Sequence, residues 1–492
     1  MTSRQELSPW DRAAPRAYIT LALCFPLDSS ADEETHKAIF EHTKQSLARL
    51  AEKRPDFASR MVREDKSIFI HENASNEIPF DVLKKNDVHF PYTYEELERD
   101  GFPACAFVNP ALSVAADPLD GGNRVPVSQV RLLFIEGGFV LLAYVHHAFA
   151  DGRCVDAFLQ LLGAATRGAD DVPLEVTRKT GRSLDLGLPE EEGEKQEDAT
   201  QLLARCPEYK LLSKPVGPTA FDFSQQAEWE ATPKTGKTFV IDLNKLDELR
   251  KSTTVTSGGG GGKPPSQFTF LAALAWAHTT KARLAADPES DDKSQPVFRN
   301  PQDWSNPRKG LFAGNASLQT YFGNAVTMPI TKLPTIRSGA DLVSACDRAS
   351  RIIDIANAIT AANRAVDETF VLARTALFTA MGDDLSPLGI AMEPWVPHAF
   401  SMNTWEFKGR SARFWFPGVA ASSVEGENLG WRPDALRRVQ GVWSNAPHAL
   451  IAPSRIGVGK DEQELIVTLP AGAMEVLERD AGWMGLVKRV IG

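Results

Sequence analysis

The residues with the clearest chemical potential are two adjacent histidines, His146 and His147, followed by Asp151 and Gly152. They stand at the end of an apolar run, where two imidazole rings are costly to bury without a purpose. Successive side chains of a strand point to opposite faces, so the two rings cannot share one site. This argues against a metal centre, whose ligands must converge. From spacing alone two interpretations stay open: a reactive histidine, or one core histidine beside a turn histidine.

A predicted hairpin positions this motif. Residues 129–135 and 139–146 are apolar and rich in β-forming side chains, and Glu136, Gly137 and Gly138 between them are a strong hairpin signal. Residues 156–162 have the apolar spacing of a helix. The motif is therefore expected on a turn between a strand and a helix.

Strands and helices are mixed in both halves of the chain. The first half opens with a predicted strand at 18–25 and a helix at 33–51. The acidic, polar stretch 189–198 has too little apolar surface to pack and predicts a domain boundary. In the second half strands are expected at 238–243, 398–407, 413–416 and 464–469, and helices at 266–283, 339–359, 367–380 and 474–479, with Ser266 as an N-cap.

Composition narrows the function. The 492 residues are 43% hydrophobic and 24% charged, which is ordinary for a globular protein. The net charge of −10 argues against nonspecific nucleic-acid binding. No apolar stretch approaches the roughly 20 residues that cross a bilayer, and the first ten residues are polar and charged, so we expect neither secretion nor a membrane partner. The five scattered cysteines indicate reduced thiols and a cytoplasmic protein.

The His-His-x-x-x-Asp-Gly pattern resembles that of the BAHD acyltransferases, and the surrounding chain resembles their fungal branch, which includes the trichothecene 3-O-acetyltransferases. Other segments occur in the family's order: 7–11 resembles its opening, 321–324 its Tyr-Phe-Gly-Asn segment, 403–405 its Thr/Ser-Ser-Trp strand, and 428–433 its Asp-Phe-Gly-Trp-Gly-Lys-Pro segment. The histidine motif alone is moderately specific, because condensation domains and chloramphenicol acetyltransferase resemble it. The ordered set, over nearly the full length, is much more specific.

The resemblance implies an α/β fold of two chloramphenicol-acetyltransferase-like lobes, with mixed β-sheets flanked by helices and an active-site channel between the lobes. Together with the polar stretch, it divides the chain into an N-terminal lobe at 1–198, a linker or crossover at 199–234, and a C-terminal lobe at 235–492 that contributes to donor binding. An acyl-CoA would be the co-substrate, with no permanently bound cofactor and no metal. The acceptor would be a hydroxyl of a small secondary metabolite, with N-acyl transfer as an alternative, and the protein a monomer.

By the same resemblance His147 is the general base. An acceptor hydroxyl is a poor nucleophile, and a neutral imidazole with a pKa near ~6.5 takes its proton during attack, which contributes about 10²–10⁴ in rate. Asp151 would turn away from the base and pair with an arginine, while Gly152 permits the backbone geometry of the turn. Trp405 and Asn403 would point the same way from a strand, and they are candidates for stabilising the oxyanion.

Several features stay open. Asn428 replaces an aspartate of the family pattern, so an ion pair expected there cannot form. The glycine-rich run 257–264 only superficially resembles a phosphate-binding loop. No residue is assigned to CoA, and the basic candidates are Lys281, Arg283, Arg432, Arg437 and Arg438. Two other functions compete: acyl transfer from a carrier-protein thioester, and a catalytically silent small-molecule-binding protein of the same fold.

Overall fold

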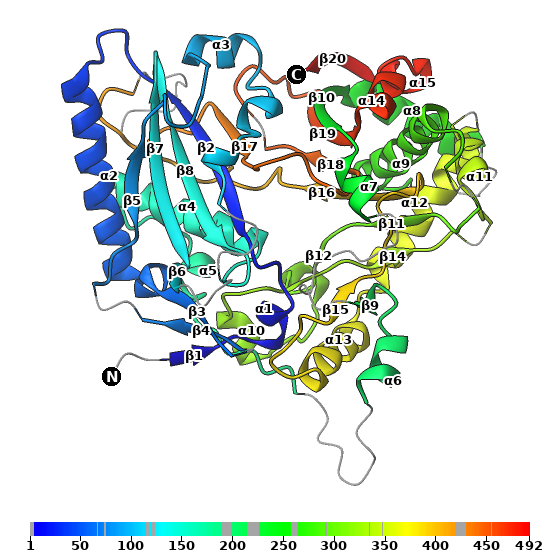
Figure 1. Cartoon of the computed structure of the whole chain (residues 1–492), viewed down its shortest axis with the longest axis horizontal. Coiled ribbons are helices and arrows are strands. Elements are labelled where there is room, and N and C mark those ends of the chain that lie inside the picture. Colours follow the sequence, from blue (N-terminus) through cyan, green and yellow to red (C-terminus); the bar gives the residue numbers. More distant parts are fainter. Residues whose placement is uncertain are drawn as a thin grey trace.

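Two mixed β-sheets, each flanked by helices, form two lobes that lie side by side in Figure 1. The computed structural model describes residues 4–492 except 66, 73–74, 115–118, 120–123, 188–197, 214–225, 257–263, 291–292, 334, 347, 420–429 and 454. Strand order in the first sheet is β17-β2-β8-β7-β5, and in the second it is β14-β11-β16-β18-β19-β10-β20. The predicted fold class is therefore confirmed.

The first sheet carries the histidine motif at the end of its central strand. Its strands are β17 (Ala435–Arg438), β2 (Tyr18–Pro26), β8 (Gly138–His146), β7 (Ser128–Ile135) and β5 (Phe80–Leu83). Strands β7 and β8 form the predicted antiparallel hairpin, with Ile135 opposite Gly138. Gly137 in its turn has φ +77°, a conformation that glycine adopts at little cost. A smaller sheet beside it contains β1 (Arg4–Glu6), β4 (Ser67–His71), β3 (Arg60–Glu64) and β6 (Arg124–Pro126).

The second sheet forms the centre of the other lobe. Its strands are β14 (Ile330–Thr331), β11 (Val297–Arg299), β16 (Ala399–Thr404), β18 (His448–Ile451), β19 (Glu462–Pro470), β10 (Lys234–Asp242) and β20 (Val487–Ile491). Strand β16 runs parallel to both β11 and β18, and the other pairs are antiparallel. Short pairs also form between β12 (Gln302–Asp303) and β13 (Val326–Thr327), and between β9 (Tyr209–Leu211) and β15 (Leu388–Ile390).

Helices cover the sheets where their apolar faces require it. Buried side chains of α2 and α4 join the core of the first lobe, and those of α9, α12 and α14 join the core of the second. The helices are α1 (Pro9–Arg12), α2 (Glu33–Lys53), α3 (Tyr94–Arg99), α4 (Gly152–Arg167), α5 (Leu174–Thr177), α6 (Ala199–Ala204), α7 (Gln226–Ala231), α8 (Leu243–Thr256), α9 (Gln267–Ala286), α10 (Ala316–Thr320), α11 (Gly339–Val343), α12 (Ala349–Arg364), α13 (Glu368–Ala380), α14 (Ala471–Leu477) and α15 (Ala481–Met484).

Most predicted elements are confirmed, and two are corrected. Ser266 caps α9 as expected, its side chain accepting a hydrogen bond from the backbone N–H of Thr269. The helix predicted at 339–359 is two helices, α11 and α12. Residues 413–416 form no strand; only Phe414 makes an isolated bridge, to Trp431. In the described part of the chain, no helix is long and apolar enough to cross a membrane.

One strand of the C-terminal half belongs to the first sheet. Strand β17 pairs antiparallel with β2, and Figure 1 shows this orange strand beside the blue one. Ala412, Phe414 and Phe416, which precede it in the chain, pack into the core of the first lobe. The division at residues 198 and 235 stays a prediction, and β17 shows that the chain returns to the first lobe after residue 235.

Candidate active site

The strand β8 delivers the two histidines to opposite environments. His146 is completely buried, and its Nδ1 accepts a hydrogen bond from the backbone N–H of Ala148 at 3.2 Å. Burial lowers the pKa of His146 to about 3, so this ring is a neutral core group. His147 is partly exposed, and its Nδ1 lies 3.2 Å from Oδ1 of Asn324. The structure therefore assigns the core position to His146 and the open position to His147.

Asn324 fixes the tautomer of His147. The Nδ2 group of Asn324 donates to Oδ1 of Asp11 at 2.9 Å and to the backbone carbonyl of His147 at 2.8 Å. Both partners are acceptors only, so the amide oxygen must be the atom that faces the imidazole. Nδ1 of His147 then carries the hydrogen and donates it, which leaves the lone pair on Nε2. The ring is held in the form that can accept a proton.

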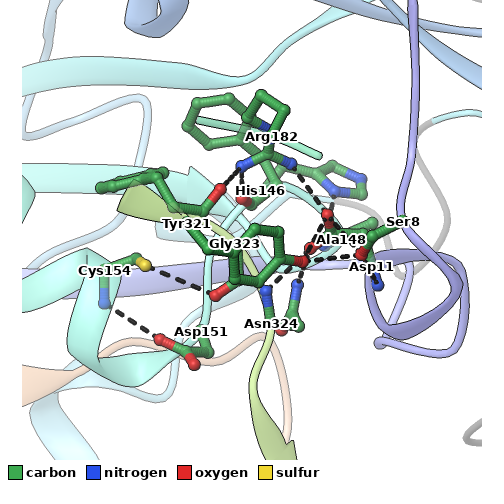
Figure 2. A network of polar contacts seen from close by, with 12 residues as sticks. Ser8, Asp11, His146, Ala148, Asp151, Cys154, Arg182, Tyr321, Gly323 and Asn324 are labelled. Atoms are coloured by element: carbon green, nitrogen blue, oxygen red, sulfur yellow. Dashed lines mark hydrogen bonds and ion pairs between the residues drawn. The ribbon is translucent and has the colours of Figure 1, made fainter. Parts of the chain in front are cut away.

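The carboxylate of Asp11 organises this arrangement from the N-terminal segment. It accepts hydrogen bonds from Ser8 Oγ at 2.9 Å, from the Tyr321 hydroxyl at 2.9 Å and from the backbone N–H of Asn324 at 2.8 Å. Arg182 forms an ion pair with it at 3.2 Å. Figure 2 shows Asp11 enclosed by these four partners. Two sequence segments that resemble the family, 7–11 and 321–324, thus meet at one buried acid.

Asp11 and Asn324 were not predicted as site residues. Both belong to segments whose resemblance to the family was recognised, and that resemblance was the available signal. Their contact joins residues 313 positions apart in the chain, which no local pattern indicates.

Asp151 acts on the backbone. One carboxylate oxygen accepts from the N–H groups of Arg153 and Cys154, each at 3.0 Å, and so caps α4. The other accepts from the N–H of Ala325 at 3.1 Å, which ties the turn to the Tyr321–Asn324 segment. The implied arginine partner is a correction: among the described residues no ion pair joins Asp151 to an arginine. Arg182, the arginine buried nearby, pairs with Asp11.

The backbone of Gly152 needs no special conformation, which corrects the expected reason for a glycine here. It begins α4, and its φ is outside the positive region. A Cβ atom at this position would lie 2.9 Å from Nζ of Lys408. Cys154, two residues on, is buried with its thiol directed at the Gly323 carbonyl, and burial raises its pKa well above the usual value. It is a packed cysteine, as expected.

Burial and neighbouring cations set the protonation of His147. Burial, followed by the charges of Lys408 and Arg438, lowers its pKa to about 4. Lys408 is itself only 2% exposed, and burial lowers its pKa to about 7. At pH 7 His147 is therefore neutral.

A cavity of about 180 Å³ lies where the two lobes meet. Its lining includes Asn403 of β16, Trp405 directly after β16, and His448 of β18. Arg438 of β17 lines it from the other lobe. The two predicted residues Asn403 and Trp405 thus face the same space. Nζ of Lys408 lies 4.2 Å from the centre of the Trp405 ring, and Cζ of Arg438 lies 5.7 Å from it. The charges of both cations lower the pKa of His147.

The structure separates the basic residues that were candidates for CoA. Arg283 is buried and donates to four backbone carbonyls, and Arg437 is buried and pairs with Glu464 at 2.8 Å. Lys281 pairs with Asp480 at 3.1 Å, and Arg432 is exposed. Arg438 is the candidate that lines the cavity. Asn428 and residues 257–263 of the glycine-rich run lie outside the described residues.

The motifs' resemblance is confirmed by comparison with known proteins. Residues 17–166 match the model of the trichothecene 3-O-acetyltransferase-like N-terminal domain. The chain is 24% identical over 392 residues to the acyltransferase cm3D of Cordyceps militaris, covering 74% of this chain and 75% of that protein. It is 24% identical over 354 residues to the acyltransferase easC of Emericella nidulans, covering 67% of this chain and 68% of that protein.

The fold is also similar to that of a solved structure. The crystal structure of F. graminearum TRI101 complexed with coenzyme A and deoxynivalenol superimposes with a TM-score of 0.73 at 17% identity, and all of both chains is covered. At this identity the match establishes the fold, and the chemistry of the present chain must be argued from its own residues.

Proposed function

We propose that this chain, whose N-terminal part matches the acetyltransferase-like domain, transfers an acyl group from an acyl-CoA thioester to a hydroxyl of a small secondary metabolite, with His147 as general base. Acetyl is the acyl group that we propose first. The observation that carries the proposal is the orientation of His147, because Asn324 leaves the lone pair of Nε2 available to accept a proton. The similarity to curated fungal acyltransferases supports the same reaction class.

The reaction needs no covalent enzyme intermediate. Nε2 of His147 takes the proton of the acceptor hydroxyl while its oxygen attacks the thioester carbon. The carbonyl oxygen becomes negative in the tetrahedral intermediate. Collapse breaks the carbon–sulfur bond, and the departing thiolate takes the proton from His147, which yields the ester and free CoA. The low pKa of His147 keeps the whole population in the base form, and the adjacent oxyanion stabilises the imidazolium formed during transfer.

Trp405 and Asn403 are proposed to stabilise the oxyanion. Oδ1 of Asn403 accepts from the backbone N–H of Thr404 at 2.7 Å, so its Nδ2 group is the end available to donate. The indole N–H of Trp405 is a second donor on the same wall of the cavity. One well-placed donor to an oxyanion contributes about 2.7–4 kcal/mol. Asp151 and Gly152 hold the turn that carries His147.

We also propose a cellular location and an oligomeric state for the protein. A cytoplasmic location agrees with the five cysteines, none of which forms a disulfide. We also propose a monomer, because the two lobes that form the cavity come from one chain.

The test is release of CoA thiol from a panel of acyl-CoAs, with and without a pooled metabolite extract as acceptor. His147→Ala should abolish acceptor-dependent release. The exposed His89 provides the control, because His89→Asn also removes an imidazole and asparagine tolerates its φ of 47°. Equal thiol release by wild type and His147→Ala would contradict the base assignment.

A further inference from the structure

Arg438 is a cation in the cavity that forms no ion pair with an acid among the described residues. Its guanidinium donates to Nε2 of His448 at 3.5 Å and lies over the ring of Trp405, and both of these partners are neutral. His448 is neutral because burial and the charge of Arg438 lower its pKa to about 4, and its Nδ1 donates to the Ala446 carbonyl, which leaves Nε2 as the acceptor. In the described part of the chain no carboxylate forms an ion pair with Arg438.

The neighbouring Arg437 has an acidic partner. Arg437 precedes Arg438 on β17, so its side chain points to the opposite face, and there it pairs with Glu464 at 2.8 Å. Arg182 and Arg374 are also buried and also pair with acids, Asp11 and Glu208. Among the described contacts, the partly buried Arg438 has neither an acid nor the backbone carbonyls that hold Arg283. Removing such a charge from water is costly, so Arg438 indicates a group that binds from outside the chain.

The walls of the cavity favour an anion. None of the described residues that line it is acidic. Ser401, Ser444 and Asn403 supply neutral polar groups around Arg438. The amino group of Lys408 also lies over the Trp405 ring. The charges of Asp151 and Asp156 act on this amino group, so its positive charge is better balanced than that of Arg438.

The location of Arg438 argues against the phosphates of CoA as the anion. Its guanidinium lies over the Trp405 ring, as does Nζ of Lys408, and that amino group reaches the turn at Gly152 that follows His147. The pantetheine arm separates the CoA phosphates from the sulfur, so a group bound beside the base belongs to the acyl chain or to the acceptor. A planar guanidinium matches a carboxylate with two parallel hydrogen bonds.

We propose that this cavity is a carboxylate subsite, in which Arg438 binds a carboxylate carried by one of the two substrates while the reacting carbonyl lies toward His147. The inference rests on the proposed acyl transfer. It makes the substrate class an acidic one: a dicarboxylic acyl-CoA, or an acceptor that bears a carboxylate.

Equilibrium binding to the whole protein distinguishes the two sources. In the donor arm, succinyl-CoA is compared with butyryl-CoA, whose acyl chain has the same number of carbons and no carboxylate. In the acceptor arm, 4-hydroxybenzoate is compared with 4-hydroxybenzamide, its neutral counterpart, on protein saturated with CoA. A carboxylate bound by Arg438 should be favoured at least about tenfold in Kd in one arm.

The variants assign that preference to Arg438. Arg438→Gln should abolish it, and Arg438→Lys should restore part of it because the charge remains and the planar fork is lost. Arg432→Gln is the matched control, an exposed arginine on the same approach to β17, and it should keep the full preference. No preference for the acid in either arm, or a preference that survives in Arg438→Gln, would overturn the proposal.

Binding also separates this inference from the proposed function. If the acid is preferred in binding and no thiol is released from any acyl-CoA, the subsite stands and the acyl-transfer proposal fails. If acyl transfer is measured and the neutral substrates bind as well as the acids, the subsite fails alone.

Discussion

Removing the side chain of Asn324 should slow acyl transfer by releasing the orientation of His147. Asn324→Ala deletes the acceptor for the Nδ1 hydrogen, a contact of 3.2 Å, together with the donors to Asp11 and to the His147 carbonyl. One hydrogen bond is worth about 1 kcal/mol, which corresponds to roughly a fivefold effect. The ceiling is the contribution of the base itself, about 10²–10⁴. We therefore expect kcat to fall by about tenfold or more, and by less than in His147→Ala.

The assay is a double-mutant cycle of thiol release. If Asn324 acts through the base, Asn324→Ala has little further effect in a His147→Ala background. Tyr321→Phe is the control for stability, because it removes another donor to Asp11 and leaves the contact between Asn324 and His147 intact. Its kcat should stay near that of the wild type. The reasoning is refuted if Asn324→Ala keeps the wild-type kcat, or if it slows the His147→Ala enzyme by the same factor as the wild type.

Two further predictions concern pH and packing. Burial and the charges of Lys408 and Arg438 lower the pKa of His147 to about 4, so kcat/KM should stay constant from pH 7 to about 5 and fall as the pH drops through about 4. A fall in kcat/KM near pH 6.5 would contradict this. Lys408→Met removes a positive charge and should move the fall to higher pH. Gly163→Ala should destabilise the fold by about 1–3 kcal/mol, because its Cβ would lie 2.3 Å from the backbone oxygen of Arg413. Gly152→Ala meets side-chain atoms, chiefly the end of Lys408, and no backbone atom, so it should lower Tm less; an equal loss in both variants would contradict the packing argument.

The local structure around the site was predictable because it depends on neighbours in the chain. The hairpin of β7 and β8 follows from apolar strands on either side of Gly137 and Gly138. The alternation of a strand is enough to place His146 and His147 on opposite faces. Ordered motifs then indicated the family and the two-lobe fold. The choice of His147 as base came from that resemblance, and its role stays a proposal.

The polar contacts that complete the site depend on residues far apart in the chain. Asp11 meets Asn324, Lys408 lies against Gly152, and Arg438 reaches the cavity from a strand that returns to the first lobe. The expected arginine partner of Asp151 was wrong for the same reason, since Arg182 is held by Asp11.

The sequence by itself determined the periodic elements, the strand-to-helix turn and the histidine pair, because these depend on side-chain alternation and local backbone preferences. Only the tertiary structure decided which nitrogen of His147 keeps its lone pair, and that Arg438 lines the cavity without an ion pair to a described acid. Both depend on the direction and charge of groups brought together by packing, and sequence spacing carries no record of either.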